Sequence, residues 1–329
     1  MTATPPLLSV ILLTQGSFEV LRRVVGHLRA QGVRDRIELV LVAPSEAGLQ
    51  PDPAALEGFH GVSVVATGPI EAAGVAVAAG ARVASAEIVV YVEEHSFPAP
   101  GWAEALIRAH EGPWAAVGPA MTNANPDSMA SWTSFLLDFG AWVLPAEAGP
   151  ADTLPAHQTS YKREVLLSYG EALGDLLETE TTLQHDLKAR GHGLFFEPAA
   201  RTDHLNISRL SDIAILQFHN YRAFAANRAR DGRWPWSRRL AYIVGSPLIP
   251  LVRGARILGQ VRDRGLGRTM LPGILPPLAM GLVAGAAGEV LGYSLGAGDS
   301  PRARLTFELD RLSHVSDRDR RRLLSGGRR

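Results

Sequence analysis

The chain has 329 residues, of which 46% are hydrophobic and 20% charged, so it is long enough for one large domain with an additional region. Its 33 basic and 33 acidic residues leave no net charge, and we therefore expect no nucleic-acid partner. The absence of cysteine excludes disulfides, thiolate metal sites and a cysteine nucleophile. Because residues 1–6 lack the pattern of a secretory signal, we expect the N-terminal domain to be cytoplasmic.

Short apolar runs alternate with helical patterns over the first 92 residues. The runs are typical of buried strands, and they cover 7–13, 37–42, 61–66 and 87–92. Helical spacing follows the first run, and an alanine-rich helix is predicted at 72–84. This alternation predicts an α/β fold with a mostly parallel sheet flanked by helices. Ligands bind such sheets beyond the carboxyl ends of the strands.

The middle of the chain is less regular. Residues 112–156 mix proline, glycine, asparagine and serine with three tryptophans, which predicts an ordered loop layer. Helices are predicted at 161–169 and 173–190, and Gly191 and Gly193 end the second one before a short strand at 194–197.

The last third combines arginines with apolar stretches. Residues 201–270 contain thirteen arginines and only four aspartates. Apolar runs cover 240–252 and 269–288. The second run is long enough to span a bilayer, but Pro272, Pro276 and Pro277 also fit an interfacial or re-entrant hairpin, and both alternatives remain open. We expect a helical membrane-associating region at 211–298 and a charged tail at 299–329.

The most informative motif follows the fourth predicted strand. Glu93, Glu94 and His95 end that strand and offer oxygen and nitrogen ligands to a divalent ion, which could neutralise a diphosphate. Acidic residues at strand ends are also common on solvated loops, so the three residues alone do not identify a site. Pro98 and the segment 100–102 (Pro-Gly-Trp) complete the pattern.

This pattern resembles family 2 glycosyltransferases, in which a strand leads into an aspartate-rich metal motif, a proline, and Pro-Gly-Trp at a helix start. Glu93 and His95 take the places of the outer aspartates, and Glu94 takes the middle place. The resemblance implies a GT-A (Rossmann-like) catalytic domain at 1–210, a nucleoside diphosphate sugar as donor, and Mg²⁺ or Mn²⁺ as cofactor. Because glutamate is longer than aspartate and histidine is a softer ligand, the metal would be held differently or weakly.

A second segment of the family supplies the catalytic base. There an acidic residue opens a helix that ends in an Arg-x-Gly turn, and counting back from Gly191 places Glu180 on that base. Glu178 is the nearest competitor, and either acid could simply favour the helix dipole. The segment 197–204 resembles the family strand that ends in a histidine, which implies that His204 contacts the metal or the diphosphate.

Further residues are assigned by the resemblance to the two substrates. Acceptor contacts fall on His157, Tyr161 and Lys162. Donor contacts fall on Thr14, Gln15, Glu46 and Glu94. Where the family has an aspartate after the second strand and Arg-Asn before the fourth, this chain has Ala43 and Val77-Ala78, so recognition of the nucleobase is expected to differ.

The resemblance therefore implies a membrane-associated glycosyltransferase with a cytoplasmic catalytic domain. It would transfer a sugar, with inversion, to a hydroxyl of a glycan or of a lipid-linked acceptor. The alternative is a membrane-associated protein that keeps the fold as a non-catalytic scaffold or binding protein. A nucleotidyltransferase is disfavoured because no glycine-rich phosphate loop follows Leu13.

Overall fold

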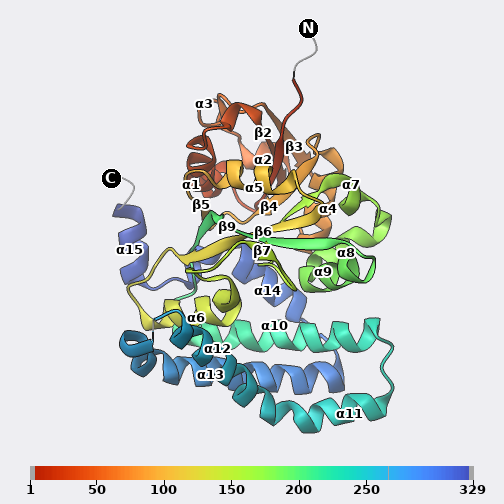
Figure 1. Cartoon of the computed structure of the whole chain (residues 1–329), viewed down its shortest axis with the longest axis vertical. Coiled ribbons are helices and arrows are strands. Elements are labelled where there is room, and N and C mark those ends of the chain that lie inside the picture. Colours follow the sequence, from red (N-terminus) through yellow and green to blue (C-terminus); the bar gives the residue numbers. More distant parts are fainter. Residues whose placement is uncertain (1–3, 266, 326–329) are drawn as a thin grey trace. The chain divides into compact units, whose positions relative to one another are not determined.

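The computed structural model describes residues 4–265 and 267–325. Residues 1–3, 266 and 326–329 lie outside the described residues. They include the first residues of the predicted catalytic domain and the last residues of the predicted tail. The chain forms two compact units, shown in Figure 1: unit 1 comprises Met1–Thr122 and Trp142–His204, and unit 2 comprises Asn123–Ala141 and Leu205–Arg329. The functional division predicted at residue 210 stays a prediction.

The N-terminal half of the sheet in unit 1 is parallel. Its strands are β1 (Leu8–Leu13), β2 (Ile37–Ala43), β3 (Gly61–Ala66) and β4 (Ile88–Val92), in the order β3-β2-β1-β4. Every residue of β1, β2 and β4 is buried, as expected for aliphatic strands covered on both faces. Leu12 pairs with Val92 and Leu13 with Val42, so β1, β2 and β4 end at one sheet edge.

Helices cover this part of the sheet and confirm the predicted α/β class. The two principal covering helices are α1 (Phe18–Arg29) and α4 (Ala73–Val83), with shorter elements α2 (Glu46–Leu49), α3 (Pro53–Leu56) and η1 (Arg34–Arg36). A stripe at helical spacing makes α1 amphipathic and buries its apolar face, namely Phe18, Leu21, Val24, Val25 and Leu28. Gly80 lets α4 approach the sheet closely, because a Cβ there would lie 2.9 Å from Ile11 and 3.0 Å from Val42.

Beyond β4 the sheet becomes antiparallel. β8 (Ser160–Lys162) pairs antiparallel with β4 and with β6 (Trp114–Asn123), and β9 (Gly193–His204) pairs antiparallel with β5 (Ser96–Pro98) and β7 (Gly149–Pro150). Helix α5 (Trp102–His110) follows β5 and packs against β9. The complete order is β3-β2-β1-β4-β8-β6-β9-β5.

Several predictions for the middle of the chain were wrong in detail. The loop layer predicted at 112–156 instead contains β6 and α6 (Met129–Phe139), with η2 (Gly140–Trp142). The helix predicted at 161–169 is β8 followed by α7 (Arg163–Leu167), and η3 (Gly170–Ala172) comes next. The helix predicted at 173–190 is two helices, α8 (Leu173–Glu178) and α9 (Glu180–Ala189), and the short strand at 194–197 extends through the whole of β9.

Unit 2 is helical. It contains α6, α10 (Leu210–Asp231), α11 (Trp236–Gly245), η4 (Ser246–Leu248), α12 (Ile249–Asp263), α13 (Gly267–Leu295), α14 (Ser300–Leu309), η5 (Arg311–His314) and α15 (Asp317–Ser325). Helices α10 and α13 lie side by side, and α6, α11 and α12 also pack against α13 (Figure 1). Apolar side chains from α6, α12 and α13 form one core of this unit, and Ile207, α10 and α14 contribute to another.

Among the described residues of unit 2, two helical stretches are long and apolar enough to cross a membrane. They are Trp236–Asp263 and Met270–Leu295. In the most apolar 18 residues of each stretch, 11% is buried in the first and 50% in the second. The core helix of a soluble protein can have the same length and composition as a membrane-spanning helix.

Candidate functional site

Three predicted metal ligands meet at the carboxyl end of β4. Glu93 follows that strand, and a turn closed by the Ser96 N–H and the Glu93 carbonyl (3.0 Å) leads into β5. Antiparallel pairing sets Ser96 opposite His204, the last residue of β9, and so brings His204 beside the turn that carries His95. The ligand atoms of Glu93, His95 and His204 lie within 4.8 Å of one another, and all three side chains are buried.

The separations within this three-ligand cluster suit a shared divalent cation. Glu93 Oε2 lies 3.3 Å from His204 Nε2 and 3.5 Å from His95 Nε2. Atoms held at about 2.1 Å from one ion are about 3.0 to 3.4 Å apart in octahedral or tetrahedral coordination. One carboxylate with two imidazoles is also a donor set that zinc and other divalent transition metals accept. The two separations from Glu93 and the chemistry of the three donors therefore fit a metal site.

The Glu93 carboxyl is held in its charged form. Burial by itself would raise its pKa, but His95, His204 and His157 together place that pKa well below the ordinary value of 4.5. The Gln158 amide also donates to Glu93 Oε2 at 3.2 Å, as does the Ser96 hydroxyl at 3.2 Å. A charged oxygen thus faces the two imidazoles of the cluster.

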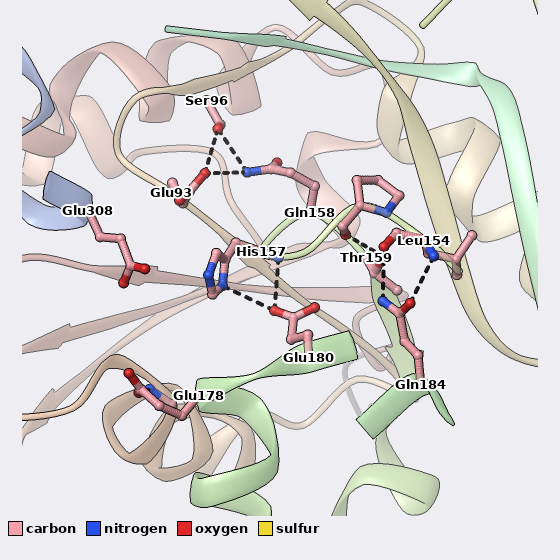
Figure 2. Close-up of polar contacts among 12 residues, drawn as sticks. Glu93, Ser96, Leu154, His157, Gln158, Thr159, Glu178, Glu180, Gln184 and Glu308 are labelled. Atoms are coloured by element: carbon pink, nitrogen blue, oxygen red, sulfur yellow. Dashed lines mark hydrogen bonds and ion pairs between the residues drawn. The ribbon is translucent and has the colours of Figure 1, made fainter. Parts of the chain in front are cut away.

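A second buried carboxylate, Glu180, opens α9. Its Oε1 accepts the His157 backbone N–H at 2.9 Å and lies 3.2 Å from Nδ1 of the same residue (Figure 2). Its Oε2 accepts the Tyr161 hydroxyl at 3.0 Å. Burial, followed by the Glu180 charge, raises the pKa of Tyr161 well above 10, so this hydroxyl remains a donor. Glu180 is consequently fixed in place by neutral and backbone donors.

The competing acid, Glu178, has a different task. Its Oε2 accepts the Gly74 N–H at 2.9 Å, at the start of α4. A carboxylate at that position satisfies a free N–H group of the first turn and interacts favourably with the helix dipole. Figure 2 shows Glu178 apart from the dashed contacts that hold Glu180. The two acids therefore have different hydrogen-bond partners.

Two adjacent residues connect the cluster to Glu180. His157 contacts Glu180, while Gln158 donates to Glu93 and, at 2.8 Å, to the Ser96 hydroxyl. His157 has a φ of 60°, in the left-handed region that non-glycine residues rarely occupy, and this conformation is sustained by its contacts on both sides. The two carboxylates thus belong to one hydrogen-bonded constellation (Figure 2).

Gln158 and Ser96 were not predicted as site residues. The polar run 157–160 could have indicated them. If such a run is buried, its polar groups must form hydrogen bonds with other protein groups. In the structure Gln158, Thr159 and Ser160 are all buried.

The predicted donor residues lie at the same sheet edge or next to the cluster. Thr14 follows β1, is buried, and its hydroxyl oxygen accepts the Gly16 N–H at 3.0 Å. Gln15 is exposed and donates to the Ile70 carbonyl at 3.1 Å, and Glu46 is exposed at the start of α2. Glu94 is buried, and its Oε1 lies 3.1 Å from His95 Nδ1, the ring nitrogen not directed at Glu93.

Of the predicted acceptor residues, two are near Glu180 and one is not. His157 and Tyr161 both contact Glu180, although Tyr161 is buried. Lys162 pairs with Ile88 at the beginning of β4, the end opposite Glu93, and its ammonium group donates to the Gly112 carbonyl at 3.3 Å. The structure therefore does not bring Lys162 to the cluster, because the antiparallel β8 runs away from it.

Comparisons with known proteins give structural similarities only. No family model and no curated protein matches the sequence. A mannosyltransferase from Pyrobaculum calidifontis, solved with GDP-Man and Mn²⁺, is 15% identical with a TM-score of 0.48, over 99% of this chain and 80% of that one. S. aureus TarS 1-349 with UDP is 15% identical with a TM-score of 0.47, over 87% of this chain and 90% of that one. GalNAc-T7 with UDP, GalNAc and Mn²⁺ is 15% identical with a TM-score of 0.46, over 71% of this chain and 52% of that one. These values are too low to transfer any of those activities to the chain.

Proposed function

We propose that the chain is a glycosyltransferase with a GT-A-like catalytic domain, which moves a sugar from a nucleoside diphosphate to a hydroxyl group with inversion. The observation that carries this proposal is the joining of the three-ligand cluster and Glu180 through His157 and Gln158. This constellation lies beyond the carboxyl ends of parallel strands, where such sheets bind ligands. The motif resemblance at Glu93 and Glu180 supplies the reaction class.

Each part of the constellation has a role in this reaction. Glu93, His95 and His204 would hold a divalent cation, Mg²⁺ or Mn²⁺ in the prediction from sequence, which when bound neutralises charge on the donor diphosphate. Glu180 accepts the proton of the acceptor hydroxyl as that oxygen bonds to the sugar carbon and the bond to the diphosphate breaks. His157 and Tyr161 orient Glu180 through the hydrogen bonds described above.

The remaining assignments complete the proposal. We assign Thr14, Gln15 and Glu46 to the donor, and their positions after β1 and β2 at the same sheet edge support this assignment. The acceptor is a glycan or a lipid-linked molecule, the catalytic domain is cytoplasmic, and the helical region associates with the membrane. The two long apolar helical stretches of unit 2 favour this membrane association.

A matched pair of substitutions tests the base. Glu180→Gln keeps the shape of the side chain but removes the proton acceptor, so transfer should fall at least about 100-fold, within the range of general-base contributions. Donor binding, measured by calorimetry, should persist. Glu178→Gln retains an oxygen that can accept the Gly74 N–H and should leave transfer largely intact. Equal activity of the two variants would remove Glu180 from the role of base.

The alternative is a non-catalytic membrane-associated protein of the same fold. Ala43 and Val77, at the positions where the family resemblance places nucleotide-binding polar residues, are buried apolar side chains here. Calorimetry with a panel of nucleoside diphosphates, with and without Mn²⁺, distinguishes the two functions. Metal-dependent nucleotide binding followed by donor turnover supports the transferase, whereas absence of binding across the panel supports the scaffold.

A further inference from the structure

A row of exposed apolar side chains runs along the helical stretch formed by α11, η4 and α12. We name this row the apolar stripe: Trp236, Leu240, Val244, Leu248 and Leu251. Its members recur at intervals of four, four, four and three residues, and they are between 58% and 72% exposed. Apolar residues at this spacing normally face a core, whereas a contiguous exposed apolar row marks an interaction surface.

The charges around the apolar stripe are almost entirely positive. The stretch Trp236–Asp263 contains five arginines and a single acidic residue, Asp263. Unit 2 as a whole has 21 arginines and 11 acidic residues, a net charge of +10 with neutral histidines. A partner with matching chemistry therefore has an apolar interior and an anionic boundary, which describes a bilayer containing anionic phospholipid.

A cavity of about 520 Å³ borders the stripe within unit 2, and Leu248 of the stripe is part of its lining. Its lining includes Arg228, Tyr242, Arg253, Arg256 and Glu289. Glu289 Oε1 lies 3.1 Å from an Arg253 guanidinium nitrogen and compensates that charge, which leaves the lining positive overall.

Aromatic rings hold two of the cavity's guanidinium groups. Arg253 lies 3.6 Å above the ring of Tyr221, and Arg228 lies 4.9 Å from the ring of Trp234 and 5.0 Å from that of Tyr242. Stacked guanidinium groups lose little freedom when they bind a phosphate, for which arginine has a matching fork of donors. The cavity thus suits the phosphate of a lipid headgroup whose acyl chains lie along the stripe.

The uncharged part of the first stretch is shorter than a helix that spans a bilayer. Only the 13 residues at 240–252 separate Arg239 from Arg253, and as a helix they extend about 20 Å, against about 30 Å of hydrocarbon. A helix of this length with arginines at both ends fits the plane of the interface, where the long side chains reach the headgroups.

The second stretch, α13, has the packing of a core helix. A Cβ added at Gly288 would lie 2.2 Å from the Phe218 carbonyl oxygen, and one at Gly292 would lie 2.4 Å from the Arg222 carbonyl oxygen, so glycines bring α13 directly onto α10. Helix α10 carries Arg222, Arg228 and Arg230, which are unsuited to the interior of a bilayer. The partner of α13 along this face is thus a polar protein helix.

We propose that unit 2 docks in the plane of an anionic phospholipid bilayer through the apolar stripe, and that the arginine-lined cavity receives a headgroup phosphate. This inference specifies the membrane association in the proposed function and gives it an interfacial form. Vesicle binding needs no donor sugar and no transfer, so the two proposals can fail independently.

The test is co-sedimentation of the purified full-length chain with two kinds of vesicle: phosphatidylcholine alone and phosphatidylcholine mixed with phosphatidylglycerol. The mixed vesicles should bind at least about tenfold more tightly, given roughly a fivefold gain for each arginine near the surface. The double variant Val244→Asp/Leu248→Asp should lose binding to both kinds. Val83→Asp, at an exposed apolar position of α4, is the control and should bind normally.

The cavity is tested by Arg228→Gln/Arg256→Gln against Arg230→Gln/Arg318→Gln, a pair with the same loss of charge at exposed positions of unit 2 that do not line the cavity. The cavity pair should lower affinity for the mixed vesicles about thirtyfold, and the control pair should lower it by far less. Equal losses would overturn the headgroup site.

Three further results would overturn the docking surface. One is a chain that resists alkaline extraction from cell membranes, since that behaviour indicates a spanning helix. Another is a dimer in size-exclusion chromatography that the Val244→Asp/Leu248→Asp variant converts to a monomer while vesicle binding is absent, because a second copy would then cover the stripe. The third is binding of inorganic phosphate in the cavity by a chain that does not bind vesicles.

Discussion

Nδ1 of His95 lies 3.1 Å from Glu94 Oε1, whereas Nε2 is directed at Glu93. A carboxylate at one imidazole nitrogen holds the proton there and leaves the other nitrogen with a lone pair for a metal ion. From sequence, Glu94 takes the middle place of the motif and was predicted to contact the donor. From its position beside His95 we propose that Glu94 orients this proposed metal ligand.

We therefore predict that Glu94→Ala weakens Mn²⁺ binding about 10- to 100-fold, the usual effect of losing such an orienting partner. Glu94→Gln retains an oxygen that can accept from Nδ1 and should recover part of the affinity. Calorimetric titration of the purified chain with Mn²⁺, without donor, gives the measurement. Unchanged affinity in the alanine variant would show that Glu94 does not orient His95.

His110 provides a prediction on acid stability. Burial, followed by the charge of Lys162, lowers the pKa of this histidine to about 4. In the unfolded chain its pKa is about 6.5, so between these values the unfolded state binds a proton that the folded state excludes, and stability rises with pH. The free energy of unfolding should fall by about 2 kcal/mol from this residue alone between pH 7 and pH 5.

Denaturant unfolding of the wild type and of His110→Gln at the two pH values isolates this contribution. The variant lacks the titrating ring, so its stability should change less over the interval, while the other acid-sensitive groups remain common to both proteins. Parallel losses in the two proteins would contradict the assignment.

At the scale of elements, the strands and the two principal helices of the first 92 residues were predictable because β1, β2 and β4 are apolar apart from Ser9 and Glu38 and α1 has a clear stripe. The residues of β6 were not recognised as a strand, because Gly118 and Pro119 interrupt them and their pairing with β8 is a long-range contact. The same limit applies to the site: the pairing of Ser96 with His204 depends on β5 and β9, which no local pattern connects.

Close packing of α13 on α10 leads to a prediction about glycine. Gly288→Ala would place a methyl group 2.2 Å from the Phe218 carbonyl oxygen, and since backbone cannot move aside cheaply, the helices must separate. We expect a loss of about 1–3 kcal/mol in the free energy of unfolding, as for other overpacked cores.

Gly259→Ala is the matched control for this substitution. Gly259 lies within α12, and a Cβ there meets nothing within 4 Å, so alanine should stabilise the chain by up to about 1 kcal/mol through helix propensity. Thermal or denaturant unfolding measures both variants. Stabilisation by Gly288→Ala would show that α10 and α13 are not in such close contact.

At the scale of the whole molecule, the neutral net charge conceals a strong separation of sign. Unit 1 has 12 basic and 22 acidic residues, a net charge of −10, and unit 2 has the +10 that balances it. Total charge therefore gave no indication of a partner, although the local excess of arginine after residue 200 did. An anionic bilayer would attract unit 2 and repel unit 1, so the charge distribution favours one unit as the membrane-facing part.

This separation predicts how salt should act on membrane binding. The Debye length shrinks from about 10 Å at 0.1 M salt to about 3 Å at 1 M, which screens the arginines of unit 2 but does not weaken burial of the apolar stripe. Affinity for mixed phosphatidylcholine and phosphatidylglycerol vesicles should therefore fall with added NaCl to the level measured for phosphatidylcholine alone, and should fall no further. The Val244→Asp/Leu248→Asp variant lacks the apolar contribution and should show no binding at either salt concentration. Binding of the wild type that does not change with salt would mean that the charge separation between the units has no part in membrane docking.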